Sequence, residues 1–401
     1  MDLKGKHVLL GVSGGIAAYK IASLASALKK QGADVTVLMT KNACEFITPL
    51  TFETLTGNKC LIDTFDRNFE FSVEHVSVAQ SADVILVAPA TANIIAKLAH
   101  GIADDMLTTT YLACTCPKLV SPSMNTRMYK NPVTQDNIET LRRYGTQVIL
   151  PDSGYLACGD TGEGRMPDPS VLQQHIEYAL TEKDLAGKKI LVTAGPTQEA
   201  LDPVRFLSNH SSGKMGYRIA ERAAMRGAEV TLVSGKTALD TPLFVKKINV
   251  TSAEEMAEAV LDNAAEQDII IKAAAVADYR PKTVADEKIK KKDDDLYIPL
   301  ERTRDIPKTL GENKKPGQFL CGFSMETEHM EENAREKLVK KNLDLIVANN
   351  VKTEGAGFAV DTNVVKLIGH DETVALPLLD KAEVADRLLS HILHKITGTA
   401  E

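Results

Sequence analysis

Short apolar runs alternate with helix-like spacing along the first half of the chain. Residues 8–12 form an apolar run, and apolar side chains then recur at positions 17, 21, 24 and 28, the interval of an α-helix. Gly32 ends this predicted helix, and residues 35–39 form a second, β-branched run. The pattern predicts a strand, a helix and a second parallel strand, which together make a βαβ unit.

The same alternation continues to residue 188. Further strands are predicted at residues 84–88, 119–121 and 147–150, and helices at 133–144 and 171–180. Residues 71–78 have the alternation of a strand, and residues 151–169 are interpreted as a Gly-rich loop. Buried strands that alternate with helices predict a parallel sheet covered on both faces.

Residues 189–401 repeat this pattern, and the polar stretch 181–189 separates the two halves. The predicted elements are strands at 190–194, 230–234, 269–272, 319–323 and 345–348, helices at 214–226, 253–265, 327–341 and 382–396, and a hairpin at 364–376. Residues 273–278 are expected to extend the 269–272 strand, with Asp278 at its carboxyl end. The fold class is therefore α/β, with two tandem doubly wound domains at residues 1–188 and 189–401.

Composition and charge exclude several classes of protein. A content of 44% hydrophobic and 25% charged residues is that of ordinary globular domains. The 401 residues exceed the ~250 to 300 that a single core normally holds, in keeping with two domains. The formal net charge of -7 argues against a broad nucleic-acid-binding surface, since such binding depends on Lys and Arg.

Hydropathy and cysteine usage indicate a cytoplasmic protein. No segment approaches the ~20 apolar residues that cross a bilayer, and the first apolar run is too short for a signal peptide. The six cysteines include no C-x-x-C pair, so neither a disulfide framework nor a zinc site is indicated. We expect reduced thiols and no membrane association.

Small and polar residues follow the predicted strands of the first half. Ser13, Gly14 and Gly15 follow the first strand, Thr40 the second, residues 89–93 the third and residues 122–125 the fourth. Ligands of doubly wound sheets bind at these carboxyl ends. The full G-x-G-x-x-G pattern is missing, which disfavours an NAD-dependent dehydrogenase and suits a phosphate monoester such as that of FMN better. Glycines that only make a tight turn remain the alternative.

Three residues in this half have side chains suited to chemistry. His75 could be a general base or a structural histidine. Asn125 could offer its amide to a carboxylate or only form a turn. Cys158 lies in a Gly-rich segment, where core packing explains a cysteine poorly, so a proton donor or nucleophile is the better interpretation.

Four motifs in this half resemble the flavin-dependent cysteine decarboxylase family, in particular the decarboxylase half of the bifunctional enzymes of coenzyme A synthesis. They are Ser13-Gly14-Gly15-Ile16-Ala17, Ala88-Pro89-Ala90-Thr91-Ala92-Asn93, Pro122-Ser123-Met124-Asn125 and Ala157-Cys158-Gly159 with Gly164-Arg165-Met166. The resemblance implies a flavodoxin-like flavoprotein domain with trimeric contacts. The FMN-binding residues that it implies are Ser13, Gly14, Gly15, Thr40, Thr91, Ala92, Asn93, Ile94 and Ser123.

The chemistry that this resemblance implies explains the need for a cofactor. Loss of CO2 from a cysteine carboxylate leaves a carbanion that needs an electron sink. With FMN as oxidant, the CH2–SH group becomes a thioaldehyde whose C=S bond stabilises that charge, and the hydride then returns to the ene-thiol. The resemblance assigns His75 as the base, Asn125 as the carboxylate contact and Cys158 as the proton donor of the final reduction.

The second half contains an incomplete phosphate-loop motif. Ser211-Ser212-Gly213-Lys214 suggests a P-loop, but Ser208 replaces the first glycine and Met215 replaces the Ser or Thr that would bind magnesium. The lysines at 288 and 290–292 could neutralise a developing pyrophosphate or only form a solvated loop. Asn209 is a polar loop residue for which turn structure is the alternative.

This half resembles the phosphopantothenate–cysteine ligase half of the same bifunctional family. The motifs are Ala194-Gly195-Pro196-Thr197, Asp202-Pro203-Val204-Arg205, residues 208–216, residues 273–278 and Lys288-Ile289-Lys290-Lys291. The resemblance implies a Rossmann-like domain with dimer contacts that uses CTP and Mg2+ to form an acyl-cytidylate of 4'-phosphopantothenate, which cysteine then attacks. It assigns Asn209 and Lys288 to catalysis, and the nucleotide to Ala274, Asp278, Lys288, Pro307, Lys308, Thr309, Leu310, Phe323, Lys337 and Lys341, with Pro307 to Leu310 as a turn. The magnesium ligands are left open.

The combined resemblance covers essentially the whole chain and implies synthesis of phosphopantothenoylcysteine followed by its decarboxylation to 4'-phosphopantetheine. One alternative is a flavin-dependent decarboxylase of peptidyl cysteine, which the complete ligase-like half disfavours. Another is a regulatory flavoprotein of the same fold. Such relatives typically lose part of the catalytic set, whereas His75, Asn125 and Cys158 are all present.

Overall fold

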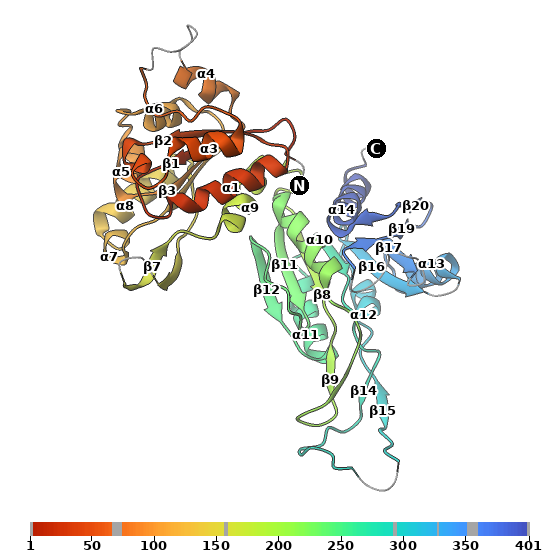
Figure 1. The fold of residues 1–401 in the computed structure, drawn as a ribbon. Coiled ribbons are helices and arrows are strands. Elements are labelled where there is room, and N and C mark those ends of the chain that lie inside the picture. Colours follow the sequence, from red (N-terminus) through yellow and green to blue (C-terminus); the bar gives the residue numbers. More distant parts are fainter. Residues whose placement is uncertain are drawn as a thin grey trace. The chain divides into compact units, whose positions relative to one another are not determined.

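The structure, a computed structural model, describes residues 3–65, 74–155, 159–291, 295–326, 329–350 and 360–398. The chain divides into two compact units, Met1–Thr181 (unit 1) and Glu182–Glu401 (unit 2). In Figure 1, unit 1 runs from red to yellow-green and unit 2 from green to blue.

Unit 1 is built on a parallel sheet. Its described strands pair in the order β2-β1-β3-β4-β5, all parallel. Their bounds are β1 His7–Val12, β2 Asp34–Met39, β3 Val84–Ala90, β4 Lys118–Pro122 and β5 Gln147–Val148. This is the flavodoxin-like order. The direction in which successive strands are added to the sheet reverses between β1 and β3. The predicted flavodoxin-like fold is confirmed, and the reversal locates the expected binding crevice.

Helices cover both faces of this sheet. They are α1 Ala18–Lys30, α2 Lys41–Cys44, α3 Pro49–Thr56, α4 Glu74–Ser81, α5 Ala92–His100, α6 Met106–Ala113, α7 Thr126–Tyr129, α8 Pro132–Arg143 and α9 Pro169–Leu180. Val8 and Leu10 of β1 belong to one buried cluster with Ile21 of α1, whereas Leu9 belongs to the opposite cluster with Ile94 of α5. The period-2 alternation of a strand thus puts apolar side chains on both faces, which is why β1 reads as a continuous apolar run.

Two local predictions in unit 1 need correction. The expected strand at 71–78 is wrong for residues 74–78, the part that the structure describes, because these residues belong to helix α4. Val78, Ala79 and Ala82 pack in the same apolar cluster at helical spacing. The Gly-rich segment 151–169 is more ordered than a loop. It contains an antiparallel hairpin of β6 Asp152–Tyr155 and β7 Thr161–Arg165.

Unit 2 contains a larger mixed sheet. Its described strands pair in the order β12-β11-β8-β13-β16-β17-β19-β20, parallel from β12 to β17 and antiparallel at the β19 and β20 edge. The bounds are β8 Lys189–Ala194, β11 Glu229–Ser234, β12 Val245–Asn249, β13 Ile269–Lys272, β16 Phe319–Glu326, β17 Leu345–Asn350, β19 Val365–Ile368 and β20 Thr373–Ala375. In chain order the parallel part reads 3-2-1-4-5-6, the Rossmann order, with its reversal between β8 and β13. The predicted second doubly wound domain is confirmed.

Helices again lie on both faces. They are α10 Lys214–Met225, α11 Ala253–Ala264, α12 Ile306–Glu312, α13 Met330–Lys340 and α14 Lys381–Thr397. Ile269 and Ile271 of β13 pack in one cluster with α10 and α14, whereas Ile270 packs in the other with α11, α12 and α13. The next residue, Lys272, therefore points to the same face as Ile270.

A long arm leaves this sheet. Strands β14 Tyr279–Pro281 and β15 Leu300–Arg302 form an antiparallel hairpin, and we call residues 279–302 the arm. Figure 1 shows the arm extending from the carboxyl end of the sheet. Two short pairs accompany the main sheet: β9 Gln198–Ala200 with β10 Phe206–Ser208, and β18 Thr362–Asn363 with β21 Leu379–Asp380.

Two predictions in unit 2 also need correction. The expected strand over 273–278 is wrong, because β13 ends at Lys272 and Asp278 lies six residues farther along the chain. The expected turn at Pro307 to Leu310 is helix α12; Asp305 caps it by accepting from the Lys308 N–H at 3.1 Å, and proline fits its first turn.

No helix among the described residues is long and apolar enough to cross a membrane.

Candidate functional site

A cavity of about 590 Å³ lies at the reversal point of the unit 1 sheet, and we call it the unit 1 cavity. It is lined by loops that follow β1, β3 and β4 and by the β6–β7 hairpin. Its lining includes five residues predicted to bind FMN and one predicted to act on substrate, namely Gly14, Gly15, Thr91, Ala92, Ser123 and Asn125. Residues far apart in the sequence thus meet where doubly wound sheets bind ligands.

Ser13 joins two of these loops. Its side chain is 1% exposed, its Oγ donates to the Pro89 carbonyl at 2.7 Å, and the Thr91 N–H donates to the same Oγ at 3.1 Å. Thr91 in turn caps α5 by accepting from the Ile94 N–H. Ser13 therefore holds the β1 and β3 loops together.

Two glycines permit close backbone approach around the cavity. A Cβ on Gly14 would lie 2.5 Å from the Cβ of Asn42, and a Cβ on Gly164 would lie 2.2 Å from the Met124 carbonyl oxygen. Gly164 also has a φ of +129°, which L side chains rarely adopt. The Met124 N–H donates to the Gly164 carbonyl at 3.0 Å. The hairpin therefore docks on the loop that carries Asn125.

Asn125 has its side-chain orientation fixed from two sides. Its Oδ1 accepts from the Arg127 N–H at 2.8 Å as the N-cap of α7, and its Nδ2 donates to Asp160 Oδ2 at 3.1 Å. The side-chain amide is therefore held at the start of α7, at the edge of the cavity.

Other residues predicted for this site lie elsewhere. Thr40 caps α2, Asn93 is exposed on α5 and Ile94 is buried in the core, and none of them lines the unit 1 cavity. His75 lies in the first turn of α4, which packs against α6, and the described residues do not bring it to this cavity. Cys158 lies outside the described residues.

Residues 273–278 continue beyond β13 as an irregular segment, which a parallel bridge between Pro196 and Ala275 and two threonine hydroxyls hold against the end of β8 and the residues that follow it. The Ala274 N–H donates to Thr193 Oγ1 at 3.1 Å, and the Ala277 N–H donates to Thr197 Oγ1 at 3.0 Å. Asn209 Nδ2 donates to the Ala275 carbonyl at 3.0 Å. The segment therefore crosses the carboxyl ends of β8 and β13 and lines two neighbouring cavities.

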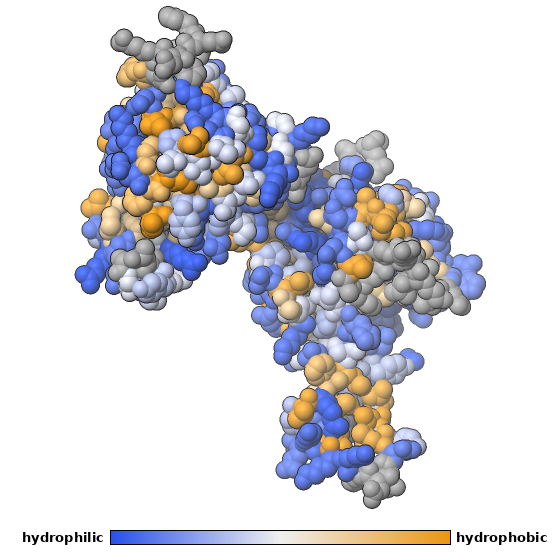
Figure 2. All heavy atoms as spheres, in the orientation of Figure 1, coloured by the Kyte–Doolittle hydropathy of each residue, from blue (hydrophilic) through white to orange (hydrophobic). Residues whose placement is uncertain are grey.

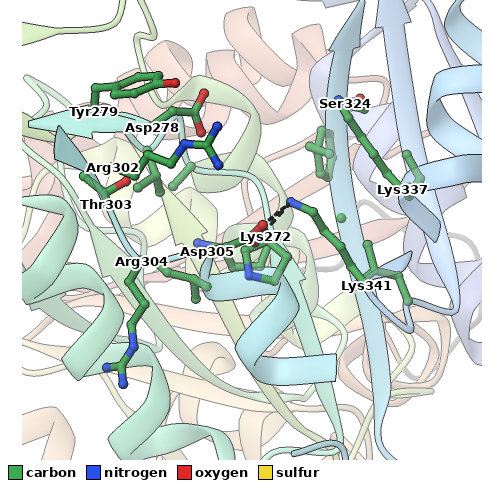
Figure 3. A pocket seen from close by; sticks show the side chains of 18 residues that line it. Lys272, Asp278, Tyr279, Arg302, Thr303, Arg304, Asp305, Ser324, Lys337 and Lys341 are labelled. Atoms are coloured by element: carbon green, nitrogen blue, oxygen red, sulfur yellow. Dashed lines mark hydrogen bonds and ion pairs between the residues drawn. The ribbon is translucent and has the colours of Figure 1, made fainter. Parts of the chain in front are cut away.

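One of these cavities, about 480 Å³, lies toward α12 and α13, and we call it the Lys272 cavity (Figure 3). It contains six residues predicted to bind the nucleotide, which are Ala274, Asp278, Pro307, Phe323, Lys337 and Lys341. Phe323 lies within β16 instead of at its end, where it was expected. Lys308 and Thr309 do not line the cavity, and Leu310 is buried in the core below it.

Lys272 is the cavity residue that the sequence analysis missed. It ends β13 directly after three isoleucines, a position where a lysine is unexpected and could have been noticed. The residue is 6% exposed, and burial lowers the pKa of Lys272 to about 7; nearby Asp305 opposes this shift and Lys341 adds to it. Its ammonium group therefore gives up its proton far more readily than a surface lysine.

Lys272→Met is expected to stabilise unit 2 by about 1 to 3 kcal/mol at pH 6 and to have little effect near pH 10.5. Because the folded-state pKa is about 7 against 10.5 when solvated, the unfolded chain binds more protons between these values. The native lysine therefore destabilises the fold as pH falls through this window, fully so below about pH 7. Thermal unfolding of the full chain at pH 6 and near pH 10.5, without nucleotide, measures this. The exposed Lys340→Met is the control, and an unchanged or lower stability of Lys272→Met at pH 6 would contradict the prediction.

A neighbouring cavity of this unit, about 440 Å³, also borders residues 273–278, and we call it the Asn209 cavity. It is lined by Asn209, by residues 211–216 at the start of α10, and by Lys381. A Cβ on Gly216 would lie 2.6 Å from the Ala194 Cβ, so α10 packs directly on β8. Ala274, Asp278, Phe323 and Lys337 line both cavities, which are therefore neighbours.

The arm carries Lys288 away from these cavities. Asp202 Oδ2 accepts from the Ile289 N–H at 3.1 Å, and the Arg205 guanidinium donates to the Ile289 carbonyl at 2.8 Å. Arg205 also pairs with Asp202 and holds the pKa of that carboxyl well below its usual range. Two predicted motifs thus meet at Ile289, but the Lys288 side chain is exposed and lines none of the described cavities.

Comparison with known proteins identifies the chain. The coenzyme A biosynthesis bifunctional protein CoaBC of Bacillus subtilis (strain 168) is 49% identical over 405 residues, which cover 99% of either protein. The chain belongs to this bifunctional family of coenzyme A biosynthesis. The CoaBC protein of Escherichia coli (strain K12) is 45% identical over 397 residues, covering 98% of both proteins. The predicted family is therefore confirmed.

Two family models divide the chain as its structure does. Residues 1–181 match the Flavoprotein family, and residues 185–396 match the DNA/pantothenate metabolism flavoprotein C-terminal domain. A crystal structure of the C-terminal domain of a CoaBC protein is 48% identical, covers 54% of this chain and all of its own, and has a TM-score of 0.47.

Proposed function

We propose that unit 2 joins cysteine to 4'-phosphopantothenate with CTP, and that unit 1 converts the product to 4'-phosphopantetheine with FMN. The activities are assigned to residues 189–401 and 1–188. The observation that carries the proposal is that five residues predicted to bind FMN line the unit 1 cavity together with Asn125, and that six residues predicted to bind the nucleotide line the Lys272 cavity. Membership of the bifunctional coenzyme A biosynthesis family supports the pairing of the two steps.

The unit 1 cavity fits a flavin. Gly14 and Gly15 line the cavity at the entry to α1, and a helix N-terminus is where a phosphate monoester would bind. Apolar side chains from four elements, Ile16, Met124, Met128 and Met166, suit the flat face of an isoalloxazine ring. Thr91, Ala92 and Ser123 complete the site. The flavin supplies the electron sink that decarboxylation of cysteine requires.

The protein side chains bind the substrate and move its protons. Asn125 donates from Nδ2 to the carboxylate of the cysteine moiety, and its cap bond keeps this donor fixed. His75 accepts the proton lost on oxidation, and Cys158 returns one in the final reduction. Because His75 lies outside the unit 1 cavity, we propose that it acts on the site of a neighbouring copy in a trimer. The exposed Ile16, Tyr19 and Met128 at the cavity rim support such a contact.

The Lys272 cavity is proposed to hold the nucleotide. Phe323 offers an aromatic face to the base, and Lys337, Lys341 and Pro307, in the first turn of α12, lie around the remainder. Lys308, Thr309 and Leu310 belong to the same helix and would support the site by positioning its first turn. Asn209, in the adjoining cavity, would bind the acyl group. Mg2+ is expected with CTP because the triphosphate charge must be offset.

A dimer of unit 2 is part of the proposal. The arm exposes Val284, Leu296, Tyr297 and Leu300, and Val204 and Phe206 are exposed on the segment beside it. Figure 2 shows this apolar surface on the arm. Such a patch marks an interaction site. Pairing of two arms would bring Lys288 of one copy toward the nucleotide of another, which accounts for its distance from the cavities.

A cytoplasmic location is also proposed. The five cysteines that the structure describes are all free thiols, in keeping with a reducing compartment.

The proposed function is tested by one coupled assay with purified protein. Phosphopantothenate, cysteine, CTP and Mg2+ are expected to yield equal amounts of pyrophosphate and CO2, and the protein is expected to be yellow. Omission of CTP should stop both products, whereas supplied phosphopantothenoylcysteine should restore CO2 alone. Absence of flavin absorbance after flavin supplementation would count against the role of unit 1, and absence of pyrophosphate would count against that of unit 2.

A further inference from the structure

The Lys272 ammonium group lies at the floor of its cavity without an acceptor. It is 6% exposed, and its Nζ has no hydrogen-bond partner among the described residues. Leaving a buried ammonium unpaired is strongly unfavourable. A ligand that supplies an acceptor would remove this penalty.

The nearest carboxylate is already paired. Asp305 accepts from Lys341 Nζ at 2.9 Å and from the Lys308 N–H at 3.1 Å. Figure 3 shows this ion pair of Asp305 with Lys341 beside Lys272. Lys337, from α13, donates to Ser324 Oγ at 3.1 Å. None of these groups comes within hydrogen-bond distance of Lys272 in the described part of the chain.

Cations outnumber carboxylates around this floor. The charged and titratable residues that line the cavity come from β13, from the 273–278 segment, from the arm, from the residues between the arm and α12, and from the end of α13. They are Lys272, Asp278, Tyr279, Arg302, Arg304, Asp305, Lys337 and Lys341. With five basic and two acidic side chains among the described lining residues, the cavity favours an anion.

We propose that Lys272 donates from Nζ to a phosphate oxygen of the nucleotide, which makes Lys272 a further substrate-binding residue of the ligase. The inference rests on the proposed nucleotide site in this cavity. A phosphate oxygen can accept a hydrogen bond from Lys272 Nζ, which has no acceptor in the described part of the chain. Because the phosphate carries its own negative charge, the Asp305–Lys341 pair need not rearrange to neutralise the ammonium group.

Nucleotide binding is then coupled to proton uptake. Burial lowers the pKa of Lys272 to about 7, so in the empty cavity much of the side chain is neutral above that pH. An anion bound to Nζ favours the charged form and raises the pKa again. Affinity should therefore fall by up to about tenfold per pH unit above pH 7, because a proton must be taken up with the ligand.

The test measures binding and proton uptake of the full-length protein by titration calorimetry. CTP with EDTA is the probe, in two buffers of different ionisation enthalpy at pH 8, where the nucleotide itself does not titrate. The native protein should take up close to one proton more than Lys272→Met, and the variant should bind about 10- to 100-fold more weakly, with a flatter pH dependence. Lys183→Met is the matched control. Lys183 donates to the Met225 carbonyl, burial also lowers its pKa, to about 8, and it lies away from the cavity.

Inorganic tripolyphosphate separates this inference from the proposed function. If tripolyphosphate binds with the same dependence on Lys272 but CTP does not bind, the anion site stands and the nucleotide proposal fails. If CTP binds to Lys272→Met as it does to the native protein, the inference is overturned and the proposed function stands. If the native protein takes up no proton when CTP binds, that result by itself also overturns the inference, whether or not the variant folds.

Discussion

Replacing Lys288 by Gln is expected to lower CTP-dependent pyrophosphate release by about 100-fold or more, the usual effect of removing one cation from developing phosphate charge. The side chain is exposed on the arm, and its neighbour Ile289 is anchored through its backbone to Asp202 and Arg205. Gln at 288 keeps this anchor and removes only the positive charge. Pyrophosphate release with phosphopantothenate, CTP and Mg2+ measures the loss.

The matched control for this variant is Lys282→Gln. Lys282 is also an exposed lysine of the arm, and its backbone N–H pairs with the Pro299 carbonyl. Both variants should unfold at the temperature of the native protein, because neither position is buried. A native rate for Lys288→Gln would remove Lys288 from the ligase site. Equal loss in both variants would show that the charge of the arm as a whole matters, and not this lysine.

Replacing Asn125 by Asp is expected to slow decarboxylation of phosphopantothenoylcysteine by about 100- to 1,000-fold. Asp keeps the Oδ1 that accepts from the Arg127 N–H, so the start of α7 is retained. The donor Nδ2 is lost, and an anionic oxygen then faces both Asp160 and the carboxylate of the substrate. Release of CO2 from supplied phosphopantothenoylcysteine, with flavin absorbance recorded in parallel, measures the effect.

Asn131→Asp is the corresponding control. Asn131 also caps a helix, with its Oδ1 accepting from the Val133 N–H at 3.0 Å, but it does not line the unit 1 cavity. This variant should decarboxylate at the native rate. The Asn125 assignment fails if Asn125→Asp retains both its flavin and its rate. Loss of flavin in that variant would instead make Asn125 part of the cofactor site.

Much of the fold could be predicted from hydrophobic pattern alone. The strands at 8–12 and 190–194 are buried on both faces, so each reads as a mostly apolar run, and helix α1 repeats its apolar residues at helical spacing. Short elements were less predictable. Residues 273–278 are as apolar as a strand, yet the N–H groups of Ala274 and Ala277 donate to the hydroxyls of Thr193 and Thr197, which come within reach only after the sheet forms.

The candidate sites divide in the same way. Gly14, Thr91 and Asn125 could be predicted because each directly follows a strand, and the carboxyl ends of parallel strands meet at one edge. Thr40 and Ile94 satisfy the same rule but point elsewhere, since Thr40 caps α2 and Ile94 fills the core. His75 and Lys288 belong to segments that leave the sheet, and their distance from the cavities could not be inferred from strand order.

The sequence by itself therefore determined the two doubly wound domains, the strand-end loops that line their cavities and the family, because these depend on local periodicity and short motifs. Only the tertiary structure decided that Lys272 is a buried cation at a cavity floor. In the sequence it is one lysine after three isoleucines. Its altered chemistry arises from desolvation by α12, α13 and their neighbours, and from the pairing of Asp305 with Lys341 instead of with Lys272.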